Sequence, residues 1–221
     1  MNNLSVTKSN TLIDASYRLN AQAQKLILAC LGKIDSRGEI PKVITISAQE
    51  YSDLMGIPNA HRELYRAADS LWDAEIIIHE GDLKTRLRWV QKDVQKIKGE
   101  GAVTITWSDD VLLYISQLKN RFTTYKLHQI ASLKSSHSIR LYELLMKFKS
   151  TGERIIYLDD FKSALGIFES YKQFKELHKK VIKPAVYELN QCSDLSIKYE
   201  TIKKGRSVAA LEFTFKTKRA S

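Results

Sequence analysis

The sequence predicts an α+β chain of two tandem winged-helix domains that are related by internal duplication. The same order of elements occurs in both halves: helix, short strand, short helix, turn, longer helix and β-ribbon. A Gly-Ile pair ends the short helix of each half, beginning at Gly56 and at Gly166. Apolar positions of the two longer helices recur at the same offset. We therefore expect one domain over residues 1–118 and a second over residues 119–221.

The first half begins with a polar stretch and then supplies a helix over residues 21–34, whose apolar side chains recur at helical spacing. Residues 42–47 alternate as a short strand. Ser47 begins the next helix because Glu50 completes a capping box, and Gly56 ends it. The rest of this half is expected as a helix over residues 61–75, strands over 76–78, 85–94 and 102–107, and a helix over 108–120.

The second half repeats this order after a connector over residues 122–133. A strongly apolar-faced helix is expected over residues 135–149 and a short strand over 154–158. Residues 159–190 then predict a short helix, a tight turn and a second helix. Two stretches with period-two alternation flank Gly205, which suits a hairpin turn. These elements predict a second winged helix with the final ribbon as its wing.

The second helix of segment 159–190 has a basic face and an apolar face. At about 100° per residue its basic face collects Lys172, Lys175, Lys179, Lys180 and Lys183. The opposite face collects Phe174, Leu177, Val181 and Ala185. Such a helix can pack on a core while it offers lysines to a polyanion, although the same pattern is typical of a merely solvated face. Because Pro184 removes a backbone donor, we expect a kink or break between Lys180 and Pro184.

The positive charge of the chain lies in its second half. The net charge is +10. Residues 1–110 hold 14 basic and 15 acidic residues, net −1, whereas residues 111–221 hold 21 and 10, net +11. Such an excess favours nucleic acid, an acidic protein or anionic lipid as a partner. Lipid is the least favoured, because no basic segment is combined with a large exposed apolar face.

The common motifs of enzymes and metal sites are missing from the sequence. No P-loop, dinucleotide-binding glycine pattern, HExxH or GxSxG motif occurs. The five histidines lie far apart, and the His-X-His pattern of rolling-circle initiators and relaxases is absent. We therefore expect no enzyme activity, no metal and no cofactor. A nucleic-acid-processing enzyme with a site of scattered carboxylates stays open as an alternative.

Two features indicate where the protein resides. No apolar run approaches the roughly 20 residues of a membrane span, and the first residues lack the apolar stretch of a signal peptide. Cys30 and Cys192 lie in unlike settings without CxxC spacing, so we expect reduced thiols. Together these features predict a cytoplasmic protein that does not bind membranes.

Five segments of the chain are more specific than its general pattern, namely residues 14–31, 120–123, 138–152, 170–190 and 197–215. They resemble the initiator replication (Rep) proteins of iteron-containing, theta-replicating plasmids. The run SIRLYELL and the downstream KKGR hairpin carry the most specific part of the resemblance, which spans nearly the whole chain. It implies two winged-helix domains that arose by duplication. The chain departs from the family in being short and in Pro184, which lies where relatives continue a helix.

The resemblance implies a bacterial plasmid replication initiator that binds iteron repeats at the origin in double-stranded DNA as a monomer. It also implies a homodimer that binds an operator inverted repeat, represses its own gene and so acts in plasmid copy control. The implied protein partners are the host initiator DnaA and the replicative helicase. The N-terminal domain would carry the dimer surface and secondary DNA contacts, and the C-terminal domain would be the main reader. A duplicated winged-helix transcriptional repressor without an initiation role is the alternative.

Two sets of residues are expected to contact DNA. In the C-terminal domain they are Ser170, Tyr171, Lys172, Gln173, Lys175, Lys179, Lys180, Lys183, Lys203, Lys204 and Arg206. In the N-terminal domain they are Asn59, His61, Arg62 and Arg66. A recognition helix points its N-terminal end at the base edges, which places Lys172 and Lys175 nearest the bases and the wing on the backbone. The sequence does not separate lysine contacts to bases from contacts to phosphates.

Overall fold

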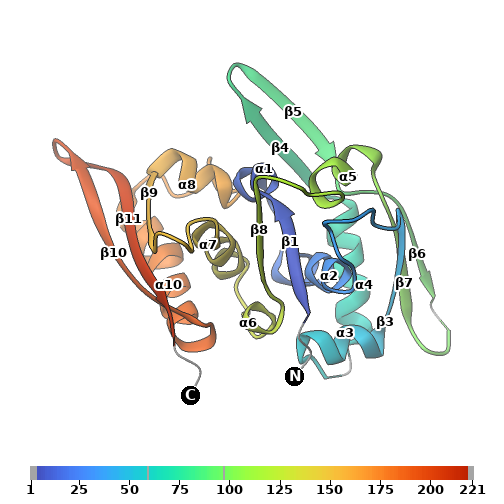
Figure 1. The fold of residues 1–221 in the computed structure, drawn as a ribbon. Coiled ribbons are helices and arrows are strands. Elements are labelled where there is room, and N and C mark those ends of the chain that lie inside the picture. Colours follow the sequence, from blue (N-terminus) through green and yellow to red (C-terminus); the bar gives the residue numbers. More distant parts are fainter. Residues whose placement is uncertain (1–3, 59, 97, 219–221) are drawn as a thin grey trace.

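The structure, a computed structural model, describes residues 4–58, 60–96 and 98–218. It contains two winged-helix units that lie beside one another, with three connecting elements between them (Figure 1). The chain therefore has the predicted α+β class, with helices and antiparallel sheets in both units.

The first unit runs from β1 to α5. Its strands are β1 (Ser5–Ser9), β2 (Ser16–Tyr17), β3 (Val43–Ser47), β4 (Glu75–Glu80), β5 (Leu83–Arg88), β6 (Val90–Lys96) and β7 (Ala102–Trp107). Its helices are α1 (Asn10–Asp14), α2 (Ala21–Gly32), α3 (Ala48–Met55), α4 (His61–Trp72) and α5 (Asp109–Ile115).

The second unit runs from β9 to β11 and follows the connection. The connecting elements are β8 (Phe122–Lys126), α6 (His128–Ala131) and α7 (Ser136–Met146). The second unit contains β9 (Glu153–Tyr157), α8 (Leu158–Ala164), α9 (Phe174–Leu177), the π-helical segment η1 (His178–Ile182), α10 (Lys183–Cys192), β10 (Leu195–Lys204) and β11 (Ser207–Thr217).

Each unit has a three-stranded antiparallel sheet of the winged-helix type. In the first unit β7 lies between β3 and β6, and in the second β11 lies between β9 and β10. In both units the first of these strands is followed by a short helix and a longer helix, and the other two strands form a hairpin wing. The order of elements predicted for a duplicated winged helix is thus present in both halves.

Residues at equivalent positions of the two halves have equivalent environments. Gly56 and Gly166, which follow α3 and α8, have φ angles of 63° and 68°. These left-handed conformations suit glycine because it lacks a Cβ atom. The apolar pairs Tyr51 and Phe161, Ala67 and Leu177, and Leu71 and Val181 are all buried. The predicted capping box is also present, since Ser47 Oγ accepts from the Glu50 N–H and the Glu50 carboxylate accepts from the Ser47 N–H.

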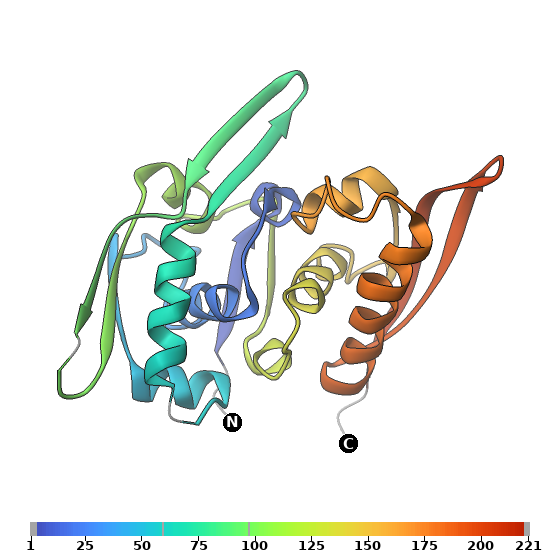
Figure 2. The ribbon, with the colours of Figure 1, turned by 180° about the vertical axis from the view of Figure 1, so that it is seen from behind.

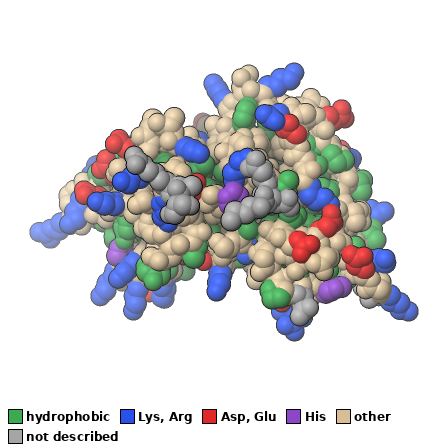
Figure 3. All heavy atoms as spheres, turned by 60° about the horizontal axis from the view of Figure 1, so that its bottom comes forward, with side chains coloured by type: hydrophobic (Ala, Val, Ile, Leu, Met, Phe, Trp, Pro, Cys, Tyr) green, Lys and Arg blue, Asp and Glu red, His purple; other side chains and the backbone are tan. Residues whose placement is uncertain are grey.

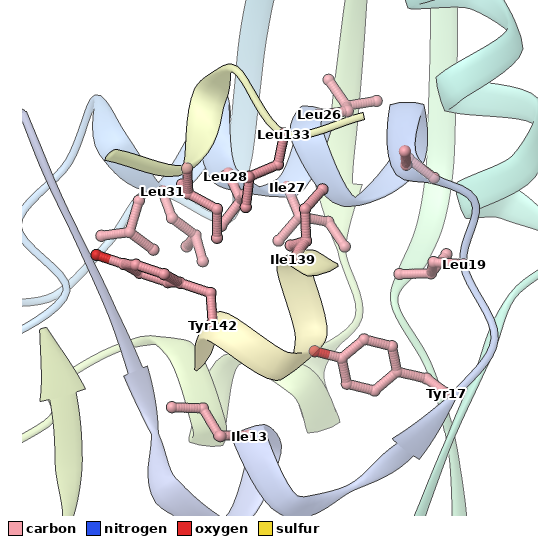
Figure 4. Close-up of a cluster of buried hydrophobic side chains, with 14 of the residues drawn as sticks. Ile13, Tyr17, Leu19, Leu26, Ile27, Leu28, Leu31, Leu133, Ile139 and Tyr142 are labelled. Atoms are coloured by element: carbon pink, nitrogen blue, oxygen red, sulfur yellow. The ribbon is translucent and has the colours of Figure 1, made fainter. Parts of the chain in front are cut away.

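The core continues from the first unit into the connection. Helix α2 is buried along almost its whole length, and α7 packs beside it (Figure 4). Leu28, Ile139 and Tyr142 lie among the buried side chains of this centre. Helix α7 also packs against α10 of the second unit. The helix that carries the SIRLYELL run is therefore the shared centre of both units.

Strand β1 corrects one sequence-based expectation about the connection. The polar start of the chain forms this strand, and β1 pairs with β8 along five residue pairs, from Ser5 with Lys126 to Ser9 with Phe122. Residues 122–126 are therefore a strand and not a simple connector. This pairing crosses the domain boundary expected at residue 118, which stays a proposal.

The predicted strand over residues 85–94 is two strands in different sheets. It is divided at Trp89, whose side chain is fully buried, so that β5 pairs with β4 and β6 pairs with β7. The β4–β5 hairpin turns at Gly81, which has a φ of 59°, and it projects from the first unit (Figure 1). The second unit has no counterpart of this hairpin among its described residues.

Within the described ranges, every helix is too short or too polar to reach across a lipid bilayer.

Candidate nucleic-acid interface

The second unit presents a helix-turn-helix with its second helix on the surface. Helix α8 ends at Ala164, Gly166 follows it, and the turn to the next helix contains Tyr171 with a φ of 55°. Segments α9, η1 and α10 then form one helical rod, because the residues at both joints, His178 and Lys183, have right-handed helical angles. The rod is exposed on the face that Figure 2 turns toward the viewer. We call this rod the second reading helix.

The second reading helix begins later than the sequence predicted. Its first residue is Phe174, so Lys172 lies in the turn and Gln173 is the residue that precedes the helix. The placement of Lys172 on a helical face is therefore wrong, although its side chain is exposed beside the N-terminal end. Ser170 and Tyr171 are half-buried, and Tyr171 packs against the core.

The apolar back of the second reading helix packs as predicted. Leu177, Val181 and Ala185 are buried, and Phe174 is half-buried. His178 reaches the adjacent strand, where its Nε2 atom lies 2.7 Å from the hydroxyl oxygen of Tyr199. These contacts fix the helix on the sheet and leave its other face to solvent.

The lysine row of the second reading helix runs through its π-helical segment and ends just before Pro184. A π turn contains more residues than the 3.6 of an α turn, so a spacing of four residues falls closer to one full turn. Lys175, Lys179 and Lys183 are all exposed, and none of them forms an ion pair with a described residue. The helix does not break where the sequence predicted a kink or break between Lys180 and Pro184; a π-helical segment, His178–Ile182, lies there, and the helix continues through it.

Lys180 lies beside that line and has a partner on its own helix. Its Nζ atom is 2.8 Å from a carboxylate oxygen of Glu176, one turn earlier. This hydrogen bond raises the pKa of Lys180 and lowers the pKa of Glu176. Because both side chains are exposed, the pair exchanges readily with solvent and ions. Lys180 therefore offers a partly neutralised charge, unlike Lys175 and Lys179.

The predicted wing is present as the β10–β11 hairpin. Gly205 takes a φ of 64° in its turn, and a β-bulge between Ile202 and Lys203 twists the ribbon close to the tip. Three exposed basic side chains surround the turn, namely those of Lys203, Lys204 and Arg206. The ribbon projects beside the second reading helix (Figure 2), as a wing that contacts a DNA backbone must.

Helix α4, the first reading helix, is less basic. His61, Arg62 and Arg66 are exposed at its start, whereas Asn59 lies outside the described residues. Arg62 lies 3.9 Å from the carboxylate of Glu63. Farther along, Asp69 and Asp73 are exposed on the same helix. Any polyanion that contacts this helix therefore meets favourable charge only near its N-terminal end.

The wing of the first unit adds basic residues that the sequence analysis left out. Lys96 ends β6 and Lys98 follows in the turn, and both are exposed. They lie at the tip of the β6–β7 hairpin, as Lys203 and Lys204 lie at the tip of β10–β11. The 110-residue offset between the halves would have indicated them, since it places Lys96 opposite Arg206.

Both reading helices lie on the same face of the molecule. Figure 2 shows α4 and the second reading helix on the near face, with α2 and α7 between them and the two wings at opposite ends. In Figure 3 several lysine and arginine side chains project together from the lower left edge, at the end that holds the second unit. Among the described residues, His, Cys, Asp and Glu side chains form no group of three that could hold a metal ion. The face is thus suited to an extended polyanion.

Family models for both units match the chain. The model described as "Initiator Replication protein, WH1" matches residues 5–146, more than half of the chain. The model described as "Initiator Rep protein, WH2" matches residues 157–215. The first match ends with α7 and the second begins at the end of β9.

Relatives and solved structures agree with these matches. An Escherichia coli "Replication initiation protein" is 30% identical over 96% of this chain and 70% of its own length. An Escherichia coli "PI protein" is 26% identical over 93% of this chain and 80% of its own length. The crystal structure of the Pi initiator protein in complex with iteron DNA superposes over 100% of both chains, with a TM-score of 0.84 and 21% identity, which supports the fold. The chain therefore belongs to the initiator replication protein family.

Proposed function

We propose that this protein is a plasmid replication initiator that binds iteron repeats in double-stranded DNA at an origin of replication. The observation that carries this proposal is the row of Lys175, Lys179 and Lys183 on a surface helix whose back is held by the core. An initiator of the same fold has been crystallised with iteron DNA. The protein would act in the bacterial cytoplasm and would contribute binding without a catalytic step of its own.

The second unit would be the main reader. The N-terminal end of its reading helix, with Lys175 and the preceding Lys172 and Gln173, would face base edges in the major groove. Lys179, Lys180 and Lys183 would contact bases or flanking phosphates, and Ser170 and Tyr171 would add contacts from the turn. The wing residues around Gly205 would contact phosphates. Helix α4 would add a weaker grip through His61, Arg62 and Arg66.

The first unit would also carry the surface of a homodimer. The β4–β5 hairpin projects from the molecule, and β5 is the outer strand of its sheet. Leu83 at the start of β5 is 71% exposed. An exposed edge strand with unpaired backbone groups is a template for pairing with a second copy. The dimer would bind an inverted repeat and repress the gene, whereas the monomer would bind iterons and recruit DnaA and the replicative helicase.

A selection experiment tests the DNA target. Duplexes that the protein retains from a random pool are sequenced, and the enriched motif is sought beside the gene. We expect the motif to occur there as tandem direct repeats. A small plasmid that carries the gene and these repeats should replicate in the host, and one without the repeats should not.

The same experiment separates initiation from repression alone. A winged-helix repressor would use the same reading helix, because both roles need the same contacts to DNA. Enrichment of a single operator without tandem repeats, together with no autonomous replication, would favour the repressor and refute the initiator.

A further inference from the structure

The SIRLYELL run forms the junction between the two units. Its Arg140 is 1% exposed although arginine is rarely buried without partners. Its guanidinium donates from Nη2 to the carbonyl oxygens of Ile13, at 2.6 Å, and Ala15, at 3.1 Å. It also donates from Nε and Nη2 to the carbonyl oxygen of Ala164, at 3.1 and 3.0 Å. One side chain therefore holds backbone of the first unit and backbone of the second.

The donors of Arg140 are matched by acceptors on both sides. Its Nη1 atom donates to Glu143 Oε2 at 2.6 Å and to the hydroxyl of Tyr17. A planar guanidinium with several donors in fixed directions defines the positions of its acceptors more strictly than a lysine ammonium does. The three carbonyl groups that it joins are therefore held at fixed positions relative to α7.

Glu143, which accepts from the Arg140 guanidinium, links it to further elements. Its carboxylate accepts from Lys8 Nζ and from the Tyr125 hydroxyl, both at 2.6 Å, so that β1 and β8 are joined to the junction. Glu143 is fully buried with both cations. A buried network in which each group has partners resists displacement, because moving one member leaves the others unpaired.

The backbone of the two units also meets beside this network. Gly166 follows α8, and a Cβ atom there would lie 2.5 Å from the carbonyl oxygen of Tyr17 and 3.1 Å from Cα of Arg18. The equivalent Gly56 has the same left-handed conformation, but a Cβ atom there would meet nothing within 4 Å. Both positions favour glycine because of their positive φ angles. Of the two, only Gly166 also needs to lack a Cβ atom so that the two units can come into contact.

We infer that Arg140 and the Gly166 contact form a rigid clamp that fixes the spacing and orientation of the two reading helices, with Arg140 as its positioning residue. Ala164 and Gly166 lie at the end of α8, directly before the turn to the second reading helix. Tyr17 lies in β2, which pairs with β4 at the end of α4. Each side of the clamp is thus one element away from a reading helix.

The role inferred for the clamp rests on the proposed function, that is, on DNA binding by both reading helices. Two DNA contacts held in one frame act as one bivalent ligand, and linkage of this kind raises affinity by about 10² to 10⁴ when the geometry fits. One base pair of B-DNA corresponds to about 3.4 Å and about 35°. If the two reading helices could move relative to one another by such amounts, the protein would lose the gain in affinity from bivalent binding. It would also no longer select one spacing between the two DNA contacts.

Two variants and a matched control test the clamp in the full chain. Gly166→Ala drives a methyl group into the backbone of Tyr17 and leaves every buried charge in place. Gly56→Ala introduces the same backbone strain without a contact, so it controls for stability. Arg140→Lys keeps the charge but loses the planar set of donors. Should Arg140→Lys fail to fold, the two glycine variants carry the test.

The first measurement needs no DNA. Nitroxide labels are placed on the exposed native Cys192 and on Asp73→Cys at the end of α4, and their distance is measured by pulsed electron resonance. Burial raises the pKa of the Cys30 thiol to about 12, so this cysteine stays unlabelled. We expect one narrow distance distribution in the parent protein and in Gly56→Ala, and a displaced or broader one in Gly166→Ala and Arg140→Lys. Identical narrow distributions in all four proteins would overturn the clamp.

The second measurement uses the DNA motif that the protein selects. Base pairs are inserted between the footprints of the two reading helices, and affinity is measured for each spacing. The parent protein and Gly56→Ala should lose about 100-fold in affinity on insertion, whereas Gly166→Ala should bind the native spacing about 100-fold more weakly and depend little on spacing. An unchanged spacing profile in Gly166→Ala would refute the inference. If the parent protein failed to bind DNA, the proposed function would fall, while the label distances would still decide the clamp.

Discussion

The substitution Glu143→Gln should destabilise the protein strongly at neutral pH. Burial by itself raises the pKa of this carboxyl, but the nearby charges of Lys8 and Arg140 and the hydrogen bonds from Lys8 and Tyr125 outweigh burial and lower it to about 2. Relative to the ordinary value of 4.5, the difference of about 2.5 corresponds to about 3.4 kcal/mol at 1.36 kcal/mol for each pKa unit. Glutamine mimics the protonated acid and leaves two buried cations without a counter-charge, which typically costs about 3 to 5 kcal/mol.

The pKa of Lys8 also indicates that Glu143→Gln should destabilise the protein. Burial, together with the nearby charge of Arg140, lowers the pKa of Lys8 more than Glu143 raises it, so the ammonium group depends on the carboxylate for its charged form. Glu143 behaves differently from Lys8. The neighbouring charges and hydrogen bonds lower the pKa of Glu143 more than burial raises it, so its charged form is favoured. Because Glu143 has two cations and Lys8 has one anion, the carboxylate is the member whose removal should cost most.

The dependence on pH follows from the lowered pKa of Glu143. An acid whose pKa is lower in the folded state stabilises the protein fully at pH values above its unfolded-state pKa, here 4.5. This contribution to stability is lost as the pH falls through the folded-state pKa of about 2. The difference in stability between the parent protein and Glu143→Gln should therefore be full at pH 7 and shrink between pH 4.5 and pH 2.

Urea unfolding followed by circular dichroism and tryptophan fluorescence measures this difference. For a chain of this size about 3.4 kcal/mol corresponds to a fall in the melting temperature of roughly 7 to 14 °C. Glu50→Gln is the control, because the exposed pair of Glu50 and Lys33 contributes only about 0 to 1 kcal/mol and glutamine can keep the capping-box hydrogen bond from the Ser47 N–H. A Glu143→Gln protein within about 1 kcal/mol of the parent at pH 7 would refute the reasoning.

Three further predictions concern single contacts. Ser47→Ala removes the cap of α3 and should cost about 0.5 to 2 kcal/mol in urea unfolding; no loss would show that the cap is dispensable. Tyr142→Phe removes the hydrogen bond to the Asp194 carboxylate, at 2.9 Å, and should cost about 1.5 to 3 kcal/mol in the same assay, whereas an unchanged midpoint would contradict this. Leu83→Lys places a charge on the edge of β5 and should shift sedimentation profiles toward monomer; an unaltered dimer fraction would move the dimer surface elsewhere.

Local patterns explain which parts of the fold could be predicted from the sequence. The capping box at Ser47, the left-handed glycines 56 and 166 and the apolar back of the second reading helix depend on residues within a few positions of one another. Such patterns determine helices, turns and hairpins, and their repetition indicated two winged helices. The lysine row was predicted for the same reason, since its residues share one helix.

Long-range contacts explain what the sequence did not reveal. Strand β1 forms because β8, more than 100 residues away, supplies its hydrogen bonds. Lys8, Arg140 and Glu143 are charged residue types that are usually exposed, yet they are buried. Their burial depends on long-range contacts, because Lys8 pairs with Glu143 across 135 residues and Arg140 donates to the carbonyl oxygens of Ile13 and Ala164. The turn before Phe174 delays the second reading helix, because Tyr171 packs on the core in a left-handed conformation.

Salt-dependent binding of a duplex that carries the selected motif tests the central proposal most directly. Lys175→Ala combined with Lys179→Ala should weaken binding and reduce the log–log slope of affinity against salt by about 0.9 for each lost phosphate contact. The control, Lys119→Ala with Lys149→Ala, removes two exposed charges outside the reading helices and wings and should leave affinity and slope close to those of the parent. A folded Lys175/Lys179 double variant with unchanged affinity and unchanged slope would contradict the account.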